Sequence, residues 1–180
     1  SDLFVGSPWV LTFSAGVDGE AYEKLTEFIL KLGARVVPLT AEAHDAAVSQ
    51  ISHLPHLIAY TLMAETESAS AVRLAALELA AGSFKDMVRV SGSSPAAWSD
   101  ICKFNAGAIQ GSLDRFANRL GEIRKLICGG DFARLAEVFK AGHKGYGRMT
   151  AGDRSVRTIE VKESDVAGRL TGILTEIQSQ

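Results

Sequence analysis

Two polar segments within otherwise apolar helical patterns carry the residue types that could do chemistry in this chain. The first is Ser52-His53-Leu54-Pro55-His56, and the second begins at Gly82 and ends at Arg89. Two histidines and an arginine within a buried-looking helical pattern are costly unless a partner satisfies them. These residues are therefore the candidate binding site, and the ligand that suits them is anionic or hydroxylated.

Three interpretations of the histidine pair are open. Two histidines three residues apart on one helix could chelate a metal, but such a site needs a further ligand, and Asp45 is two turns away from His53. Backbone carbonyls beside the intervening proline could instead satisfy both rings. His56 shares its helix face with three polar residues: Asp45, Ser49 and Ser52. That shared polar face favours the third interpretation, which is binding of an anionic or hydroxylated ligand.

Arg89 also has two interpretations. It could be a surface residue paired with Asp86 one turn earlier. Its neighbours Met87, Val88 and Val90 are apolar, however, so the guanidinium is expected to emerge from a packed turn. A guanidinium in that setting suits bidentate recognition of a carboxylate, with Asp86 orienting it.

The composition excludes several classes of protein. The chain has 180 residues, 47% of them hydrophobic and 22% charged, with a net charge of −2, as in an ordinary globular domain. No long basic run is present to neutralise phosphates, and no apolar stretch approaches the roughly 20 residues of a membrane span. We therefore expect a cytoplasmic protein that binds neither nucleic acid nor membrane. Because apolar residues typical of a folded segment, Phe4 and Val5, already occur at the start of the sequence, we expect the chain to be a piece of a longer protein.

The first 40 residues predict a strand, a helix and a second strand. Residues 9–13 are β-branched and aromatic, Asp18 opens a helix that ends at Gly33, and residues 35–39 form the second strand. This order is typical of α/β proteins but is too short for a whole domain. We expect residues 1–40 to be the C-terminal edge of a Rossmann-like domain.

The following residues, 41–152, predict an all-helical domain. Thr40 caps a helix from Ala41 whose apolar stripe includes Ile51, and Pro55 should kink it beside the histidines. A further helix covers 68–81 and is ended by Gly82, and Ser83 starts a short helical turn. The fold class is therefore mainly α.

One long helix is predicted from Ser94, as its N-cap, to Cys128. Its apolar stripe is close to a coiled-coil repeat with Asn105 as the single polar member, which favours a homodimer through residues 94–128. Asp131 caps another helix to about residue 141, and the glycine-rich residues 142–153 predict a loop or linker. The tail, 153–180, predicts a strand at 157–161 and a helix at 166–177.

The pattern resembles the prephenate/arogenate dehydrogenase family of tyrosine biosynthesis. The blocks that carry the resemblance are Phe4-x-x-x-Pro8-Trp9-Val10-Leu11-Thr12, His44-Asp45, Ser52-His53-Leu54-Pro55-His56, Gly82-x-Phe84-Lys85-Asp86-x-x-Arg89, and Pro95-x-x-Trp98-x-Asp100-Ile101-x-x-x-Asn105. Members of this family join a dinucleotide-binding domain to a helical domain that dimerises. They oxidatively decarboxylate a cyclohexadienyl substrate, prephenate or arogenate, and pass a hydride to NAD or NADP.

The resemblance also implies roles for particular residues. His56 would contact the substrate, Arg89 would pair with a carboxylate, and Gly82 would allow the backbone to approach closely. The remaining substrate-binding residues that it implies are Ser52, His53 and Asp86. The family's G-x-G-x-x-G loop and its His-Pro-Met-Ala-Gly-like segment have no counterpart in this sequence. The resemblance thus implies no catalytic, cofactor-binding or metal-binding residue here, and we expect this piece alone to be inactive.

Two further interpretations concern the tail and the class of protein. Residues 157–170 resemble the first strand and helix of the amino-acid-binding regulatory domains called ACT, which some members of the family append and which would allow tyrosine feedback in the full protein. We expect instead that this strand and helix pack on the helical body. The alternative to an enzyme is a non-catalytic helical dimerisation or regulatory module on the same scaffold.

Overall fold

The computed structural model describes residues 3–13, 16–68, 75 and 78–151. These residues are mainly helical, with one small two-stranded sheet, which confirms the predicted fold class. They form two compact units, one from the described residues of Ser1–Pro38 and Leu126–Gln180 and the other from Leu39–Lys125. The strand and helix predicted after residue 153, and most of the helix predicted at 68–81, lie outside the described residues.

The first unit begins with the predicted strand, helix and strand, which are β1 (Pro8–Phe13), α1 (Gly19–Lys31) and β2 (Arg35–Thr40). The two strands pair as neighbours in one parallel sheet. Asp18 caps α1, because its carboxylate accepts a hydrogen bond from the Glu20 N–H at 3.0 Å. Ile29 on α1 is completely buried and anchors the helix in this unit.

The turn that leads from α1 into β2 requires glycine at position 33. Gly33 has a φ of +77°, and a Cβ there would lie 3.1 Å from the Val5 side chain. Its carbonyl accepts a hydrogen bond from the Gly6 N–H at 2.8 Å, and the Arg35 N–H donates to the Ser7 carbonyl at 2.9 Å. These bonds tie the start of β2 to the segment that leads into β1.

The helix α8 (Phe132–Thr150) also belongs to the first unit, and Asp131 caps it as predicted, accepting from the Arg134 N–H at 3.1 Å. The loop predicted at 142–153 is wrong for residues 142–150, because α8 continues through Gly142, Gly145 and Gly147, and residues 152 and 153 lie outside the described residues. A glycine in a helix costs about 1 kcal/mol relative to alanine but keeps its backbone N–H, so the helical ladder is weakened without being broken.

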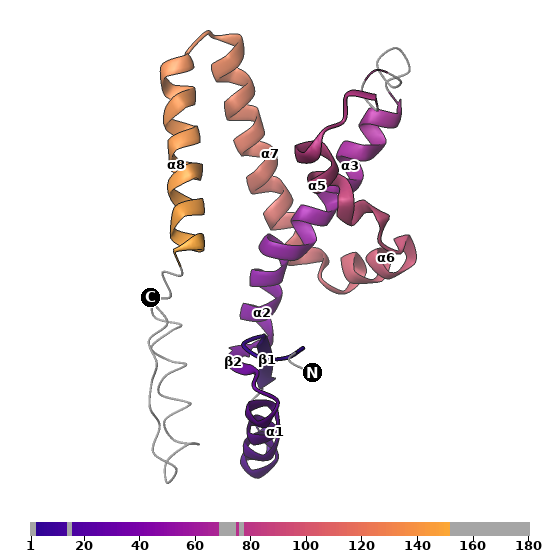
Figure 1. The fold of residues 1–180 in the computed structure, drawn as a ribbon, viewed down its shortest axis with the longest axis vertical. Helices are drawn as coiled ribbons and strands as arrows, with labels where there is room; N and C mark the ends of the chain where they lie inside the picture. Colours follow the sequence, from indigo (N-terminus) through magenta and orange to yellow (C-terminus); the bar gives the residue numbers. More distant parts are fainter. Residues whose placement is uncertain (1–2, 14–15, 69–74, 76–77, 152–180) are drawn as a thin grey trace. The chain divides into compact units, whose positions relative to one another are not determined.

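In the second unit, one continuous helical rod is formed by α2 (Ala41–Val48), the π-helical segment η1 (Ser49–His53) and α3 (Leu54–Ser68) (Figure 1). Thr40 caps the rod as predicted, accepting from the Ala43 N–H at 3.1 Å. The short helices α5 (Gly82–Val88) and η2 (Arg89–Gly92) pack against α3. The predicted cap at Ser83 is wrong: α5 already begins at Gly82, and no side chain caps it.

The π-helical segment lies where a kink was predicted from Pro55. Across η1 the Leu54 N–H bonds to the Ser49 carbonyl, five residues back instead of four. Pro55 has no N–H for the Ile51 carbonyl, so a regular α-helical pattern cannot be completed there. The wider turn also places Ile51 outward, with 74% of its surface exposed, so its predicted place in the apolar stripe is wrong.

The long helix predicted from residue 94 to residue 128 is divided into α6 (Pro95–Phe104) and α7 (Ala106–Cys128). Ser94 caps α6 as predicted. The break falls at Asn105, whose backbone leaves the helical region at φ −115° and ψ 32°. The single-helix prediction is therefore wrong, because the Asn105 side chain forms hydrogen bonds to another segment instead of occupying a place in the stripe.

A buried polar contact joins η1 to α7 inside the second unit. The hydroxyl oxygens of Ser49 and Ser112 lie 2.9 Å apart, and both residues are almost wholly buried. The Ser49 hydroxyl also donates to the Ala46 carbonyl at 2.7 Å. Because serine side chains are small and these are hydrogen-bonded, the two segments approach closely without an unsatisfied polar group. In the described part of the chain, no helix is both long enough and apolar enough to cross a membrane.

Candidate functional site

A cavity of about 460 Å³ lies within the second unit, between the rod and the α6–α7 junction. Its lining combines imidazole, carboxylate, amide and hydroxyl groups with apolar side chains, namely His44, Asp45, Val48, Ser52, His53, Asp100, Ile101, Phe104 and Asn105. A concave site with a few convergent polar groups on an apolar surface is typical of a small-molecule binding site. We therefore take this cavity and its immediate neighbours as the candidate functional site.

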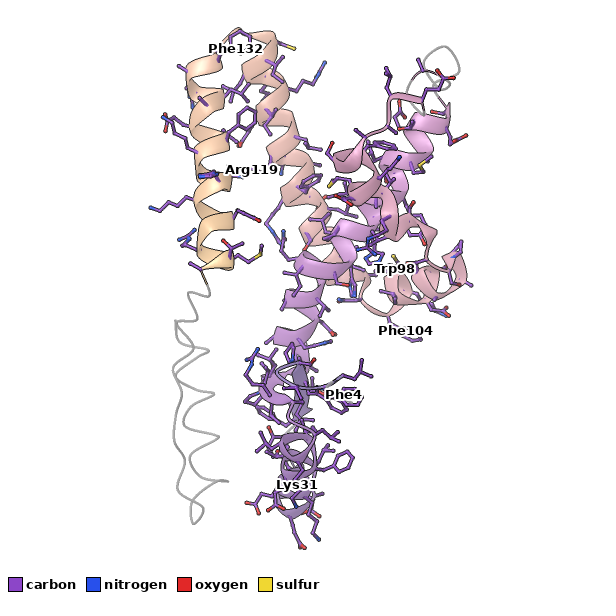
Figure 2. All side chains as sticks on the ribbon, viewed as in Figure 1. Phe4, Lys31, Trp98, Phe104, Arg119 and Phe132 are labelled. Carbon is purple, nitrogen blue, oxygen red and sulfur yellow. The ribbon has the colours of Figure 1, made fainter. Side chains whose placement is uncertain are left out.

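His56 lies one turn beyond the cavity lining and has a defined tautomer. Its Nδ1 is 3.0 Å from the Ser52 carbonyl oxygen, which can only accept, so Nδ1 carries the proton and donates. The Nε2 of neutral His56 is therefore left as an acceptor. The ring also stacks on the indole of Trp98, with centroids 3.8 Å apart and planes inclined by 24°. Figure 2 labels Trp98 between α6, which carries it, and α3.

His53 occupies the end of η1 and contacts the same tryptophan. Its ring meets Trp98 edge to face, with centroids 5.9 Å apart. Its Nδ1 lies 3.3 Å from the amide nitrogen of Asn105. Burial lowers the pKa of His53, and nearby His44 and His56 lower it further, while the negative charge of Asp45 acts in the opposite direction. The neutral form of His53 is therefore favoured.

His44 and Asp45 form a separate pair on α2. The His44 Nδ1 donates to the Asp45 carboxylate at 3.0 Å, and both side chains are partly exposed. Within the described ranges, no three histidine, cysteine or carboxylate side chains are arranged to hold a metal ion. The lining can therefore donate and accept hydrogen bonds to a polar ligand through its imidazole, hydroxyl and carboxylate groups.

The structure brings together some of the predicted site residues and leaves others apart. Ser52 and His53 line the cavity. His56 lies beside it, because its ring and that of His53 both pack on Trp98. The others, Gly82, Asp86 and Arg89, are exposed on α5 and at the start of η2, and none of them lines the cavity.

Arg89 is exposed at the start of η2. Within the described part of the chain it makes no hydrogen bond or ion pair, so the suggested pair with Asp86 is not formed. The segment that follows Arg89 is tied to α3, because the Tyr60 hydroxyl donates to the Ser93 carbonyl at 2.7 Å. The guanidinium is thus carried on an anchored segment and is available to a ligand.

Sequence reasoning missed two residues of this site. Trp98 appears among the residues that carry the family resemblance, but no role in the site is predicted for it, although its indole packs on both histidines. Asn105 was placed in a coiled-coil seam, although it lines the cavity. A signal for the break at Asn105 was present: an asparagine is unfavourable in a helix interior, because its side chain tends to form hydrogen bonds with backbone groups instead.

Comparison with known proteins gives a consistent result. Residues 40–141 match the family described as prephenate dehydrogenase, dimerization domain. A cyclohexadienyl dehydrogenase of Zymomonas mobilis is 34% identical over 145 residues, which cover 80% of this chain and 50% of that protein.

Two solved structures share the fold. The prephenate dehydrogenase of A. aeolicus, in complex with hydroxyphenyl propionate and NAD+, is 25% identical with a TM-score of 0.76 and covers 82% of this chain and 52% of its own. An arogenate dehydrogenase of Synechocystis is 27% identical with a TM-score of 0.75 and covers 82% and 54% respectively. This chain thus spans about half the length of these proteins. Because the family match extends over more than half of its residues, the chain belongs to the prephenate dehydrogenase family and carries that family's dimerization domain.

Proposed function

We propose that this chain is the substrate-binding and dimerising portion of a prephenate or arogenate dehydrogenase. The complete enzyme would oxidatively decarboxylate its cyclohexadienyl substrate and transfer a hydride to NAD or NADP. The observation that carries this proposal is the pair of histidines packed on Trp98 at the edge of the cavity, in a chain of this family. The A. aeolicus neighbour was solved with hydroxyphenyl propionate and NAD+, a ligand pair that suits the same chemistry.

The residues of the site would act by binding and orienting the substrate. With Nδ1 bonded to the Ser52 carbonyl, neutral His56 offers Nε2 as an acceptor to a ring hydroxyl. Trp98 restricts the tilt of that imidazole by stacking on it. Arg89 carries a full positive charge and a planar fork of donors, so it suits a substrate carboxylate. Ser52, His53, Gly82 and Asp86 complete the proposed substrate-binding set.

The described residues do not fit a dinucleotide cofactor. Two helices follow a strand: α1 follows β1 and α2 follows β2. The N-terminus of α2 is capped by the Thr40 hydroxyl directly after the strand, with no glycine-rich turn before it, and the N-terminus of α1 is capped by the carboxylate of Asp18. That carboxylate places a negative charge where a cofactor pyrophosphate would have to bind. When bound, NAD or NADP accepts the hydride, and we assign its binding mainly to residues outside this chain, with residues 1–40 as the edge of that domain.

The test is an assay of NAD(P)H formation by the full-length protein that contains this chain. Prephenate and arogenate are each offered with NAD+ and with NADP+, because neither preference follows from the residues described here. We expect at least one combination to be turned over. His56→Ala should then lower kcat/KM by roughly tenfold, since a substrate hydrogen bond is lost.

His143→Ala is the matched control, because His143 is an exposed histidine on α8 outside the proposed site. It should leave kcat/KM unchanged. If no combination of substrate and cofactor gives NAD(P)H, the enzyme proposal fails, and the non-catalytic helical module becomes the better explanation. Tyrosine feedback and a cytoplasmic location remain predictions of the sequence.

A further inference from the structure

Asn105 joins two helices and also two parts of the site. It ends α6 with its own backbone N–H bonded to the Ile101 carbonyl, and its carbonyl accepts the Ile109 N–H of α7. Its side chain extends to the rod, where the amide nitrogen lies 2.9 Å from the Asp45 carbonyl oxygen and 3.3 Å from the His53 Nδ1. One amide group therefore contacts both α2 and η1.

These two contacts determine which end of the Asn105 amide faces the rod and which ring nitrogen of His53 carries a proton. The Asp45 carbonyl is an acceptor only, so the amide must present its NH₂ group, and not its oxygen, to the rod. One hydrogen of that NH₂ group goes to the Asp45 carbonyl, which leaves the other for His53. The His53 Nδ1 must then accept, so it carries no proton, and the single proton of the neutral ring lies on Nε2.

We propose that Asn105 is a positioning residue that holds His53 in its Nε2–H tautomer, as a hydrogen-bond donor for the substrate in the cavity. This inference rests on the proposed function for the identity of the ligand, but not for the tautomer itself. His53 lines the cavity, and a carboxylate or hydroxyl oxygen of the substrate is the group that an imidazole N–H would recognise.

The assignment gives the two histidines opposite roles. His56 is protonated on Nδ1 through the Ser52 carbonyl and offers Nε2 as an acceptor, whereas His53 offers Nε2–H as a donor. One site thus presents an acceptor and a donor from neighbouring turns of the same rod. A hydroxylated anion, with a proton to donate and oxygens to accept, matches that arrangement.

The other ionisable groups of the site do not replace Asn105. His44 and Asp45 on α2, His56 on α3 and Asp100 on α6 surround His53. The His44 Nδ1 is bonded to the Asp45 carboxylate, and the His56 Nδ1 to the Ser52 carbonyl. Within the described residues, the Asn105 amide is the one group bonded to a ring nitrogen of His53.

The test is long-range nitrogen–proton NMR of the imidazoles in the 180-residue chain labelled with ¹⁵N-histidine, above the pKa of His53. The His53 signals are assigned by their loss in His53→Gln. We expect a protonated-type Nε2 and an unprotonated-type Nδ1 for His53, and the reverse for His56. A protonated Nδ1 on His53 in the unmodified chain would overturn the proposal without any variant.

Asn105→Asp is the diagnostic variant, because a carboxylate can accept from the His53 Nδ1–H but cannot donate to it. We expect the His53 pattern to invert to Nδ1–H, while Asn105→Leu, with no polar group, should give a mixture of tautomers. Asn118→Asp is the matched control: it makes the same change at an exposed position on α7 and should leave the His53 pattern as in the unmodified chain. An unchanged His53 pattern in a folded Asn105→Asp variant would also overturn the proposal.

Kinetics of the full-length enzyme test the consequence for the substrate. Asn105→Asp should lower kcat/KM by about fivefold to tenfold by removing a donor, and the same change in a His53→Gln background should have no further effect. A purely structural role for Asn105 would instead lower activity equally in both backgrounds. Because the NMR pattern needs neither substrate nor cofactor, it can stand even if no dehydrogenase activity is found, so the two failures are distinguishable.

Discussion

The imidazole of His56 lies nearly parallel to the indole of Trp98, with ring centroids 3.8 Å apart. The two residues come from α3 and α6, so this stack is a contact between elements as well as an orientation of the ring. Trp98 also meets His53 edge to face, at 5.9 Å. One tryptophan therefore sets the position of both histidines, and its removal should affect stability and substrate binding together.

We expect Trp98→Ala to lower the free energy of unfolding by about 2 kcal/mol, below the roughly 3–5 kcal/mol of a fully buried tryptophan, because the side chain is only half-buried. Urea unfolding followed by circular dichroism measures the change. Phe104 is the control, since it is an aromatic residue on the same helix with 82% of its surface exposed (Figure 2). Phe104→Ala should cost less than about 0.5 kcal/mol, and equal losses for the two variants would contradict this role for Trp98.

Arg89 should act on substrate affinity alone. Arg89→Ala should raise KM for prephenate or arogenate in the full-length enzyme, with a loss of about 1.5–3 kcal/mol in binding, because a charge-assisted contact to a carboxylate disappears. Arg89→Lys should restore only part of it, since lysine lacks the planar fork of donors. Steady-state kinetics with the substrate and the cofactor varied separately measure both effects.

Arg134→Ala is the control for this series, as Arg134 is an exposed arginine on α8. It should leave both Michaelis constants as they are. A wild-type KM for the cyclohexadienyl substrate in Arg89→Ala would remove Arg89 from the proposed site.

The stability of the chain should depend on the protonation of His53. Burial lowers the pKa of this group in the folded state below its ordinary value of about 6.5 in an unfolded chain. Between those two values the unfolded state binds more protons, so stability is present above pH 6.5 and is lost as the pH falls through the folded pKa. Asp45 attracts the protonated form and reduces the effect, whereas His44 and His56 add to it.

The measurement is urea unfolding at pH 7.5 and at successively lower pH, for the unmodified chain and for His53→Gln. The variant should lose less stability on acidification because its side chain does not titrate. His143→Gln, at an exposed histidine, should follow the unmodified chain. Identical pH dependence in all three proteins would show that His53 is not the group responsible.

The dimer should form through α7. Leu113, Leu120 and Ile127 lie seven residues apart on this helix, and each is 39% to 51% exposed, so they form one apolar stripe without a partner in the chain described here. A seven-residue repeat keeps such a stripe on nearly one face. Leu120→Lys should convert the dimer to a monomer in sedimentation equilibrium at micromolar concentration. Asn118→Asp, roughly 160° away around the helix, should remain dimeric, and a monomeric unmodified chain would contradict the assignment.

Much of the fold could be predicted from sequence because local chemistry determines it. Asp18, Thr40, Ser94 and Asp131 each cap the helix that they were expected to begin. The errors arose where tertiary contacts override local preference. Asn105 continues an apolar repeat in sequence, but its side-chain amide forms hydrogen bonds to Asp45 and His53, which are far away in the chain. The helix through residues 142–150 persists although its glycines favour a loop.

The site was predictable in its residue types but not in its geometry. A histidine pair beside a proline marks Ser52, His53 and His56 in one short segment. The tautomers of the two rings depend on a neighbouring carbonyl and on a distant amide, which no spacing rule reports. The place of Trp98 depends on where α6 ends, and that boundary was missed.

The number of residues in the turn at Ser49–His53 determines how side chains on the two sides of the turn are oriented around the helix axis. This turn holds one residue more than a regular α-helical turn. Relative to an uninterrupted α-helix, the side chains before it are therefore rotated by about 100° around the helix axis with respect to those after it. Deleting a single residue there would remove this offset and swing His56 away from Trp98, while Pro55 would still interrupt the helical hydrogen bonds. A protein altered in this way could keep its helical content and still lose its ligand. Circular dichroism, which reports helical content, would therefore not detect the insertion or deletion that most affects the binding site on this rod.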